Sequence, residues 1–281
     1  MKRIFPLLEV LLFVIMFLII QMVVSFLVAG FQLCFSAGTE GSELTTQLKN
    51  MMSGLSMPDA TTLIITSVVS SVLTLLVFML LRWTPASPTY LRTRPWTVFA
   101  WTVVLALGTI IPSTWLSEQI PYDMPKDLEA LFVQMMHNRW GYLSIGILVP
   151  LAEEAVFRGA VLRVLLKVFN TRWHWVPIVL SALIFGAIHG NIQQFVHATL
   201  IGLILGWMYY RTHSILPGVL FHWVNNSAAY VISNVMPGAE DIRLIDLFSG
   251  DQQAVWLALA FSFCIIIPAL FQLFLNMKRA A

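Results

Sequence analysis

The sequence predicts an all-α polytopic membrane protein, and three observations point to this fold class. Of the 281 residues, 58% are hydrophobic and only 11% are charged, whereas a soluble globular domain carries about 25% charged residues. Apolar runs long enough to cross a bilayer recur along the whole chain. The polar stretches between these runs are too short to bury a core of their own. We therefore expect a single membrane domain, residues 1–281, folded as a bundle of about eight transmembrane helices around a polar intramembrane cavity.

The N-terminal part of the chain, residues 1–140, holds the first three predicted spans. They lie at residues 4–35, 60–81 and 96–116. The first apolar run is about twice as long as the ~7–15-residue core of a signal peptide, so we interpret it as a retained span.

An amphipathic helix is predicted after the third span, at residues 126–138. Its apolar side chains recur at helical spacing along one side, at Leu128, Leu131, Phe132 and Met135. This pattern is typical of a helix that lies on the membrane surface. A lid or substrate-gating element is the alternative.

The central part of the chain, residues 141–236, contains four further predicted spans, and residues 237–281 contain a loop and the last span. These five spans lie at residues 142–166, 175–189, 194–210, 215–235 and 254–275. The first of them is interrupted by Pro150, which cannot donate a backbone hydrogen bond.

The charged residues predict the orientation of the chain. If the N-terminus is cytoplasmic and eight spans alternate, the inside segments hold most of the Lys and Arg residues and no acid, as the positive-inside rule requires. Both termini are then cytoplasmic. The short loops and compact length are typical of a prokaryotic protein, so we expect an integral protein of the bacterial cytoplasmic (inner) membrane.

Three charged side chains interrupt the predicted span at residues 142–166: Glu153, Glu154 and Arg158. At bilayer depth each costs at least ~2.5–3.5 kcal/mol on insertion scales, so partners or a function must offset the cost. On a helix, Glu154 and Arg158 lie four residues apart on one face and can pair. Glu153 points about 100° away from Glu154 around the helix axis. We interpret Glu154–Arg158 as structural support and Glu153 as the residue that carries the chemistry.

Polar side chains also occur in two later spans. His189 ends the pattern Phe-x-x-x-His that begins at Phe185, and His222 shares a helical face with Asn226. Because each of these groups costs energy in lipid, we expect them to converge with Glu153 on one hydrated cavity.

These groups suffice to hydrolyse an amide bond. A carboxylate shielded from bulk water can act as a general base, and an imidazole can hold the water, donate a hydrogen bond or bind a metal. An Asn amide can donate to a developing oxyanion. The chain has no Gly-x-Ser-x-Gly motif and no cysteine near these residues, so activation of water is favoured over covalent catalysis.

Four further polar residues match no motif: Gln193, Gln194, His197 and Asn225. We expect them to be satisfied polar side chains, with lining of the cavity as the alternative.

The three motifs together resemble the CAAX-protease and bacteriocin-processing family, a group of intramembrane proteases that includes the Rce1-type prenyl-protein endopeptidases. Glu-Glu-x-x-x-Arg, Phe-x-x-x-His and His-x-x-x-Asn follow in this order on separate spans, over about residues 150–226. Residues 141–236 are therefore expected to be the catalytic core. The resemblance implies that the first Glu activates water and that the two His and the Asn complete the site. Carried over, the catalytic residues are Glu153, His189, His222 and Asn226, supported by Glu154 and Arg158.

The resemblance leaves two options for a cofactor. Catalytic zinc typically has three protein ligands and one open position, and Glu153, His189 and His222 could supply such a set if a metal is bound. The chain has no His-Glu-x-x-His motif, and no carboxylate partners for the histidines are visible. We favour a metal-free mechanism and keep Zn²⁺ as the alternative.

The predicted function is an intramembrane endopeptidase that hydrolyses a membrane-associated or lipidated peptide with a Glu-activated water. Its partners are then a membrane-embedded or lipidated peptide and the lipid bilayer, with no nucleic acid; the oligomeric state is left unassigned. One alternative is a proton-coupled transporter, although no inverted repeat is visible. Another is a non-catalytic immunity or scaffold membrane protein.

Overall fold

The protein is described by a computed structural model covering residues 4–36, 58–85, 88–121, 124–236, 238 and 242–278. Within these ranges the regular structure consists of helices, and no strand occurs. The prediction of an all-α polytopic membrane protein is thereby confirmed. The domain boundaries predicted at residues 140 and 236 stay predictions.

The N-terminal part contains two long helices followed by four shorter ones: α1 (Ile4–Ser36), α3 (Ala60–Leu80), α4 (Pro88–Arg92), α5 (Trp96–Gly108), α6 (Ile110–Glu118) and α7 (Lys126–His137). The next helical stretch is continuous but changes its winding. It passes through the π-helical turns η1 (Tyr142–Leu148), α8 (Val149–Glu154), the π-helical turns η2 (Ala155–Leu162) and α9 (Arg163–Val168).

The remaining elements are a short 3₁₀ turn, η3 (Thr171–Trp173), and five helices: α10 (Trp175–Ala187), α11 (Ile192–Thr212), α12 (Leu216–Val235), α13 (Leu244–Leu247) and α14 (Gln252–Asn276). Each of the eight predicted spans therefore contains helix, with ends that differ by a few residues.

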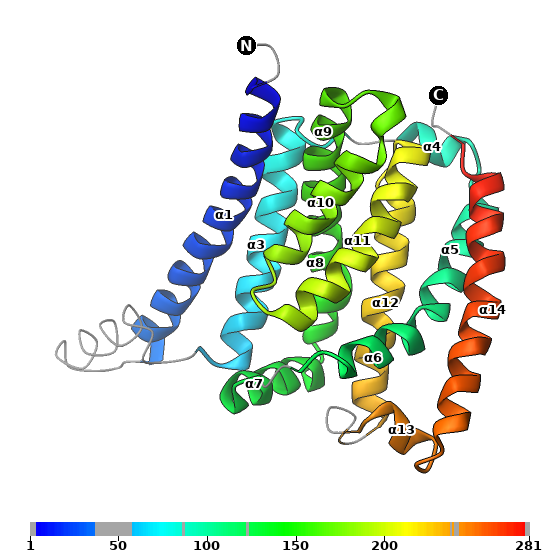
Figure 1. The fold of residues 1–281 in the computed structure, drawn as a ribbon. Helices are drawn as coiled ribbons and strands as arrows, with labels where there is room; N and C mark the ends of the chain where they lie inside the picture. The colour runs from blue at the N-terminus through cyan, green and yellow to red at the C-terminus, as the bar shows by residue number, and fades with distance from the viewer. Residues whose placement is uncertain are drawn as a thin grey trace.

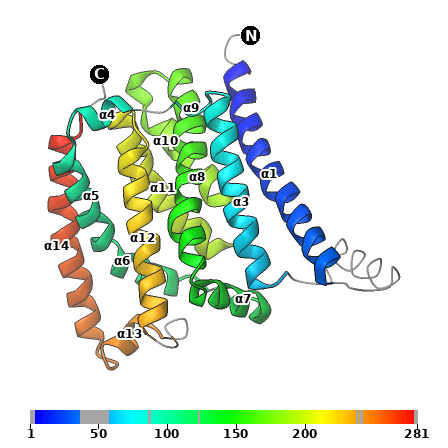
Figure 2. The same ribbon diagram turned by 180° about the vertical axis from the view of Figure 1, so that it is seen from behind.

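The stretch that carries Glu153 lies in the middle of the bundle. The α10–α11 hairpin covers one face of α8, as Figure 1 shows, and α3 and α12 flank α8 on the opposite face, as Figure 2 shows. α1 lies outside α3, and α5 and α14 form the other edge beyond α12 (Figure 1). Side chains of α8 are consequently surrounded by other helices rather than by lipid.

Among the described residues, five helical segments are long and apolar enough to cross a membrane: Phe5–Gln32, Ala60–Leu80, Trp96–Glu118, Ile192–Thr212 and Gln252–Asn276. The other three predicted spans are helical but do not meet both criteria. α10 has only 13 residues, α12 carries several polar side chains, and the stretch through α8 is interrupted by π-helical turns and by its charges. The polar spans are also the ones that carry the motifs.

The third predicted span is broken into α5 and α6 at Thr109. Pro112 lies four residues after Gly108, so it cannot donate to the Gly108 carbonyl, and its ring crowds that carbonyl. The break explains why α6 bends under the bundle instead of continuing α5 (Figure 1).

The outer surface of the bundle is suited to lipid. Large apolar side chains are exposed along α1, as at Leu8, Phe26 and Phe31, and along α14, as at Phe261 and Phe271. Several tryptophans are exposed near helix ends, where interfacial aromatic residues belong: Trp96, Trp140, Trp173 and Trp175. Together with the spans, this surface is that of an integral membrane protein.

The start of α1 and the end of α14 lie at the same end of the bundle (Figure 1). Hydrogen bonds from arginine side chains link neighbouring helix ends there. Arg163 donates to the carbonyl oxygen of Trp83 at 2.6 Å, and Arg211 donates to that of Phe274 at 2.7 Å.

The amphipathic helix predicted at residues 126–138 is present as α7. It runs across the opposite end of the bundle, roughly perpendicular to α3 (Figures 1 and 2). Met135 is buried against α3, whereas Leu128 and Phe132 remain exposed. Three hydrogen bonds join this region to α12, including one of 2.9 Å from the Asn234 amide to the carbonyl of Met136. This position fits a surface helix.

Candidate active site

The backbone around Pro150 explains how Asn226 is placed. In the π-helical turns before Pro150 each N–H bonds five residues back, as Val149 does to the carbonyl of Ser144. By that pattern Pro150 would reach the carbonyl of Ile145, but proline has no N–H to give. The side-chain amide of Asn226 donates to this carbonyl instead, at 3.0 Å. One N–H of Asn226 thus replaces the backbone donor that Pro150 lacks, and the same hydrogen bond fixes α12 beside this helix.

Glu154 and Arg158 form the ion pair that their spacing predicts. Arg158 Nη1 lies 2.8 Å from Glu154 Oε1, and the two side chains are 1% and 0% exposed. Arg158 Nη2 also lies 3.4 Å from the Gly202 carbonyl, and the guanidinium lies 4.4 Å from the Phe185 ring centroid. A β-carbon on Gly218 would meet Glu154 Oε2 at 2.7 Å, so a larger residue at this position of α12 would displace the Glu154 carboxylate. The pair joins four helical segments, consistent with its predicted supporting role.

Glu153 and His222 come together from α8 and α12. Glu153 Oε2 lies 3.6 Å from His222 Nε2, and the side chains are 12% and 10% exposed. The other ring nitrogen of His222, Nδ1, lies 3.4 Å from Glu154 Oε1. His222 therefore bridges the buried ion pair and the carboxylate that has no Arg or Lys partner among the described residues.

His189 is held by its own helix. Its Nδ1 lies 2.9 Å from the carbonyl of Phe185, and because a carbonyl only accepts, Nδ1 carries the proton in this contact. A neutral His189 then offers the Nε2 lone pair to the cavity. Gly190 adopts a φ of +75°, which turns the chain sharply after His189 into α11.

Phe185 is the common contact of these side chains. Its ring centroid lies 5.1 Å from that of His189 and 6.0 Å from that of His222, both edge-on, and its face carries the Arg158 guanidinium. The phenylalanine of the Phe-x-x-x-His pattern thus packs against both imidazoles and the buried arginine and fixes their positions relative to one another.

A cavity of about 300 Å³ opens beside Glu153. We name it the Glu153 cavity; its wall is formed by Glu153, His189 and side chains of α1, α3 and α8. Its polar lining includes Gln21 of α1 and Ser67 and Ser71 of α3. Glu153 also interacts electrostatically with both histidines of the predicted site. The predicted convergence of acid and imidazoles on a cavity within the bundle is therefore present.

Comparison with known families finds one match. Residues 136–228 match the family described as Rce1-like, Type II CAAX prenyl endopeptidase Rce1-like. The middle of the chain is Rce1-like. No curated protein and no solved structure matches the chain significantly. The suspected family is thus confirmed for this segment, and its description supports a CAAX-type intramembrane protease in general.

The Rce1-like segment contains every predicted catalytic and supporting residue. The structure brings Glu153 and His222 into contact and places His189 on the same cavity as Glu153. Asn226 differs, because its observed hydrogen bond goes to the Ile145 backbone. Nothing in the Rce1-like motifs points to Gln21, Ser67 or Ser71. The only signals would have been the amide of Gln21 in the first apolar run and the several Ser and Thr hydroxyls of the second.

The polar residues outside the motifs fall into two groups. Gln193 donates to the Ser117 carbonyl at 2.8 Å, and Gln194 accepts from the Asn191 amide at 2.9 Å, so both are satisfied as expected. His197 and Asn225 instead line a second cavity, described below.

The donor set of the Rce1-like segment does not fit a three-ligand zinc site. Among the described residues, no three His, Cys, Asp or Glu side chains are grouped as metal ligands. His222 Nδ1 lies beside the Glu154 carboxylate, a partner that the sequence did not reveal, and His189 Nδ1 bonds the Phe185 carbonyl; contacts of this kind are typical of metal-binding histidines. What the described residues lack is a third ligand grouped with Glu153 and His222, whose closest atoms are 3.6 Å apart. The designation metalloprotease is therefore not supported.

Proposed function

We propose that this chain is an intramembrane endopeptidase in which Glu153 activates a water molecule to hydrolyse a peptide bond. The observation that carries the proposal is the contact of Glu153 with His222 at the wall of a cavity within the membrane bundle. Unlike Glu154, Glu153 has no guanidinium to neutralise it. An unpaired carboxylate at this depth is costly, and a catalytic base gives a reason to keep it.

In the proposed reaction, a water molecule in the Glu153 cavity donates one proton to the Glu153 carboxylate as its oxygen attacks the carbonyl carbon. The carbonyl π bond breaks and its electron pair becomes the oxyanion. The protonated Glu153 then returns the proton to the nitrogen of the breaking C–N bond, so that carboxylic acid and amine leave. A positioned general base of this kind contributes about 10²–10⁴-fold to rate.

His189 and Asn226 have complementary parts in this proposal. With Nδ1–H committed to the Phe185 carbonyl, His189 Nε2 accepts a hydrogen bond from the water and so orients it. Asn226 has a second amide N–H beyond the one that binds the Ile145 carbonyl. Because the first hydrogen bond fixes the amide plane, the second N–H is a preorganised donor to the oxyanion, together with His222.

The proposed substrate is a membrane-associated or lipidated peptide. The outer faces of α1 and α14 are apolar, and the Glu153 cavity is lined by α1 and α3 at the edge of the bundle, so substrate reaches it from lipid. We place the protein in the bacterial cytoplasmic (inner) membrane with both termini cytoplasmic. We further propose that the reaction needs no bound metal.

Comparative peptidomics of membranes tests the function. Cells producing the wild type are compared with cells producing Glu153→Gln, which is nearly isosteric and removes only the base. We expect a set of membrane peptides whose cleavage depends on the wild type and disappears in the variant. Identical peptide profiles, with both proteins folded and present at equal amounts, would contradict the proposal and favour a scaffold or transporter.

A further inference from the structure

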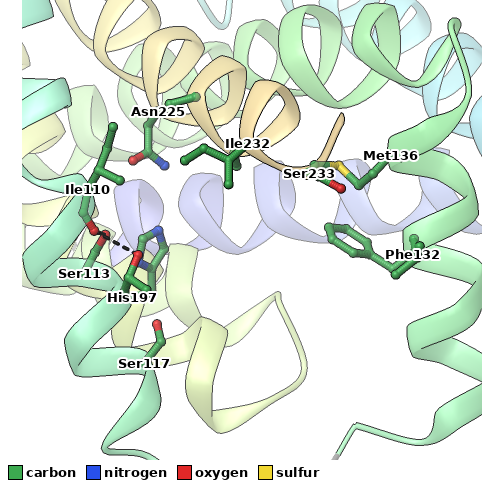
Figure 3. A pocket seen from close by; sticks show the side chains of 13 residues that line it. Ile110, Ser113, Ser117, Phe132, Met136, His197, Asn225, Ile232 and Ser233 are labelled. Carbon is green, nitrogen blue, oxygen red and sulfur yellow. Dashed lines mark hydrogen bonds between the residues drawn. The ribbon is translucent and has the colours of Figure 1, made fainter. Parts of the chain in front are cut away.

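A second cavity of about 360 Å³ lies on the other side of the site. We name it the Asn225 cavity; side chains of α6, α7, α11 and α12 line it, as Figure 3 shows. Its volume is comparable to that of the Glu153 cavity. The family match gives this cavity no role.

One end of the Asn225 cavity is polar. His197 of α11 and Asn225 of α12 extend into it toward one another (Figure 3). Within the described parts of the chain, neither side chain takes part in a hydrogen bond. Their neighbour Ser113 differs, because its hydroxyl donates to the Ile110 carbonyl of its own helix at 2.9 Å. Both side chains are half-buried, so two polar groups are available at one place to pair with a ligand.

The other end of the cavity is mostly apolar, although Ser233 also lies there (Figure 3). Phe132 and Met136 of α7 and Ile232 of α12 lie there (Figure 3). No Asp, Glu, Lys or Arg is among the described lining residues. The cavity therefore suits a neutral ligand that combines apolar groups with a hydrogen-bond donor and an acceptor.

The Asn225 cavity adjoins the catalytic residues. Asn225 follows His222 by three residues on α12, so their side chains lie on neighbouring positions of one helix face. His197 interacts electrostatically with both His222 and His189. A ligand bound at Asn225 would therefore lie about one turn of α12 from His222, the residue that contacts Glu153.

A peptide group meets these requirements. The carboxamide of Asn225 can donate to a peptide carbonyl and accept from a peptide N–H, and His197 can donate or accept once more. A lipid acyl chain would leave both groups unpaired. Apolar side chains of the same peptide would fill the end lined by Phe132, Met136 and Ile232.

We infer that the Asn225 cavity binds an apolar stretch of the substrate peptide next to the scissile bond, with Asn225 and His197 pairing with its backbone. This assignment rests on the proposed protease function and extends it to substrate recognition. Asn225 and His197 are then specificity and positioning residues, whereas the adjacent Asn226 serves the reaction itself.

The test uses full-length protein in lipid nanodiscs and a synthetic quenched fluorescent version of a peptide identified by the comparative peptidomics. In Asn225→Ala we expect KM to rise about tenfold, equivalent to about 1.4 kcal/mol, with kcat within about twofold of the wild type. His197→Ala should also raise KM. A matched control is Asn276→Ala, which removes an amide bonded to its own helix in α14 and should leave KM unchanged.

Ester-substituted versions of the same peptide locate the contact. Replacing one backbone N–H by oxygen removes the donor that Asn225 would accept, so one ester position should raise the wild-type KM about tenfold and leave the KM of Asn225→Ala unchanged. Equal ester penalties in both proteins, or a KM unaffected by Asn225→Ala, would overturn the inference while the protease function stands. A wild type that cleaves no peptide would overturn both.

A cavity-filling variant gives an independent measurement. Ala229→Leu adds volume to the cavity wall one turn after Asn225. We expect it to melt like the wild type yet to cleave the full peptide poorly. Peptides shortened on the side bound by the cavity should be cleaved equally by both proteins. Equal loss on long and short peptides would contradict the assignment.

Discussion

The buried Glu154–Arg158 pair yields the sharpest prediction about stability. Replacing Glu154 by Gln keeps the side-chain shape but removes the charge that faces Arg158, which is only 1% exposed. The guanidinium would keep only a 3.4 Å contact to the Gly202 carbonyl and the face of Phe185. Breaking one partner of a buried pair typically costs about 3–5 kcal/mol because the other charge is left uncompensated.

The expected shift in melting temperature follows from that cost. For chains of roughly 150–250 residues, 1 kcal/mol corresponds to about 2–4 °C, so Glu154→Gln should melt about 6–20 °C below the wild type. Glu153→Gln is the matched control. Its side chain is 12% exposed and its nearest ionisable partner, His222, is 3.6 Å away, so its melting temperature should stay within a few degrees of the wild type.

Thermal melting in detergent, followed by the fluorescence of the ten tryptophans, measures both variants on one scale. Adding Arg158→Met to Glu154→Gln should recover part of the lost stability, because the orphaned charge is removed. If Glu153→Gln instead lowered the melting temperature as much as Glu154→Gln, the division between structural pair and catalytic base would be wrong.

Three further predictions concern packing, the repaired helix and the cofactor. Gly218→Ala should cost about 1–3 kcal/mol by overpacking against Glu154 and should lower both the melting temperature and activity; a melting curve that overlays the wild type would contradict this. Asn226→Ala should lose about 1 kcal/mol, and Pro150→Ala in that background should restore some of it by returning an N–H to the Ile145 carbonyl; a double variant no more stable than Asn226→Ala would refute the repair. Treatment with a zinc chelator should leave activity intact and purified protein should hold substoichiometric zinc, whereas stoichiometric zinc whose removal abolishes cleavage would reverse the metal-free proposal.

Hydropathy and charge spacing predicted much of the fold. The predicted spans match α1, α3 and α14 to within a few residues at each end. The reason is that a long apolar run in a membrane must bond its own backbone groups and therefore forms a helix. The Glu154–Arg158 pair is equally local, because residues four apart on a helix must be neighbours. The break at Thr109 was readable in principle from Pro112.

Other features depend on contacts between distant segments. The hydrogen bond from Asn226 to Ile145 joins positions 81 residues apart, and nothing local distinguishes an Asn that repairs a helix from one that only faces substrate. Likewise Asn225 and Asn226 are adjacent in sequence, yet one opens into a cavity and the other contacts a backbone carbonyl. Gln21 and Ser71 became part of the candidate site only through the way α1 and α3 pack beside α8.

The proposed reaction depends above all on the Glu153 carboxylate as the base for peptide hydrolysis. Its most direct measurement is the cleavage rate of one identified peptide by wild type and Glu153→Gln, both reconstituted in liposomes and both shown to be folded by thermal melting. We expect a loss of at least about 10²-fold in kcat with little change in KM, in keeping with the removal of a positioned general base. A variant that keeps more than about a tenth of the wild-type kcat would contradict it.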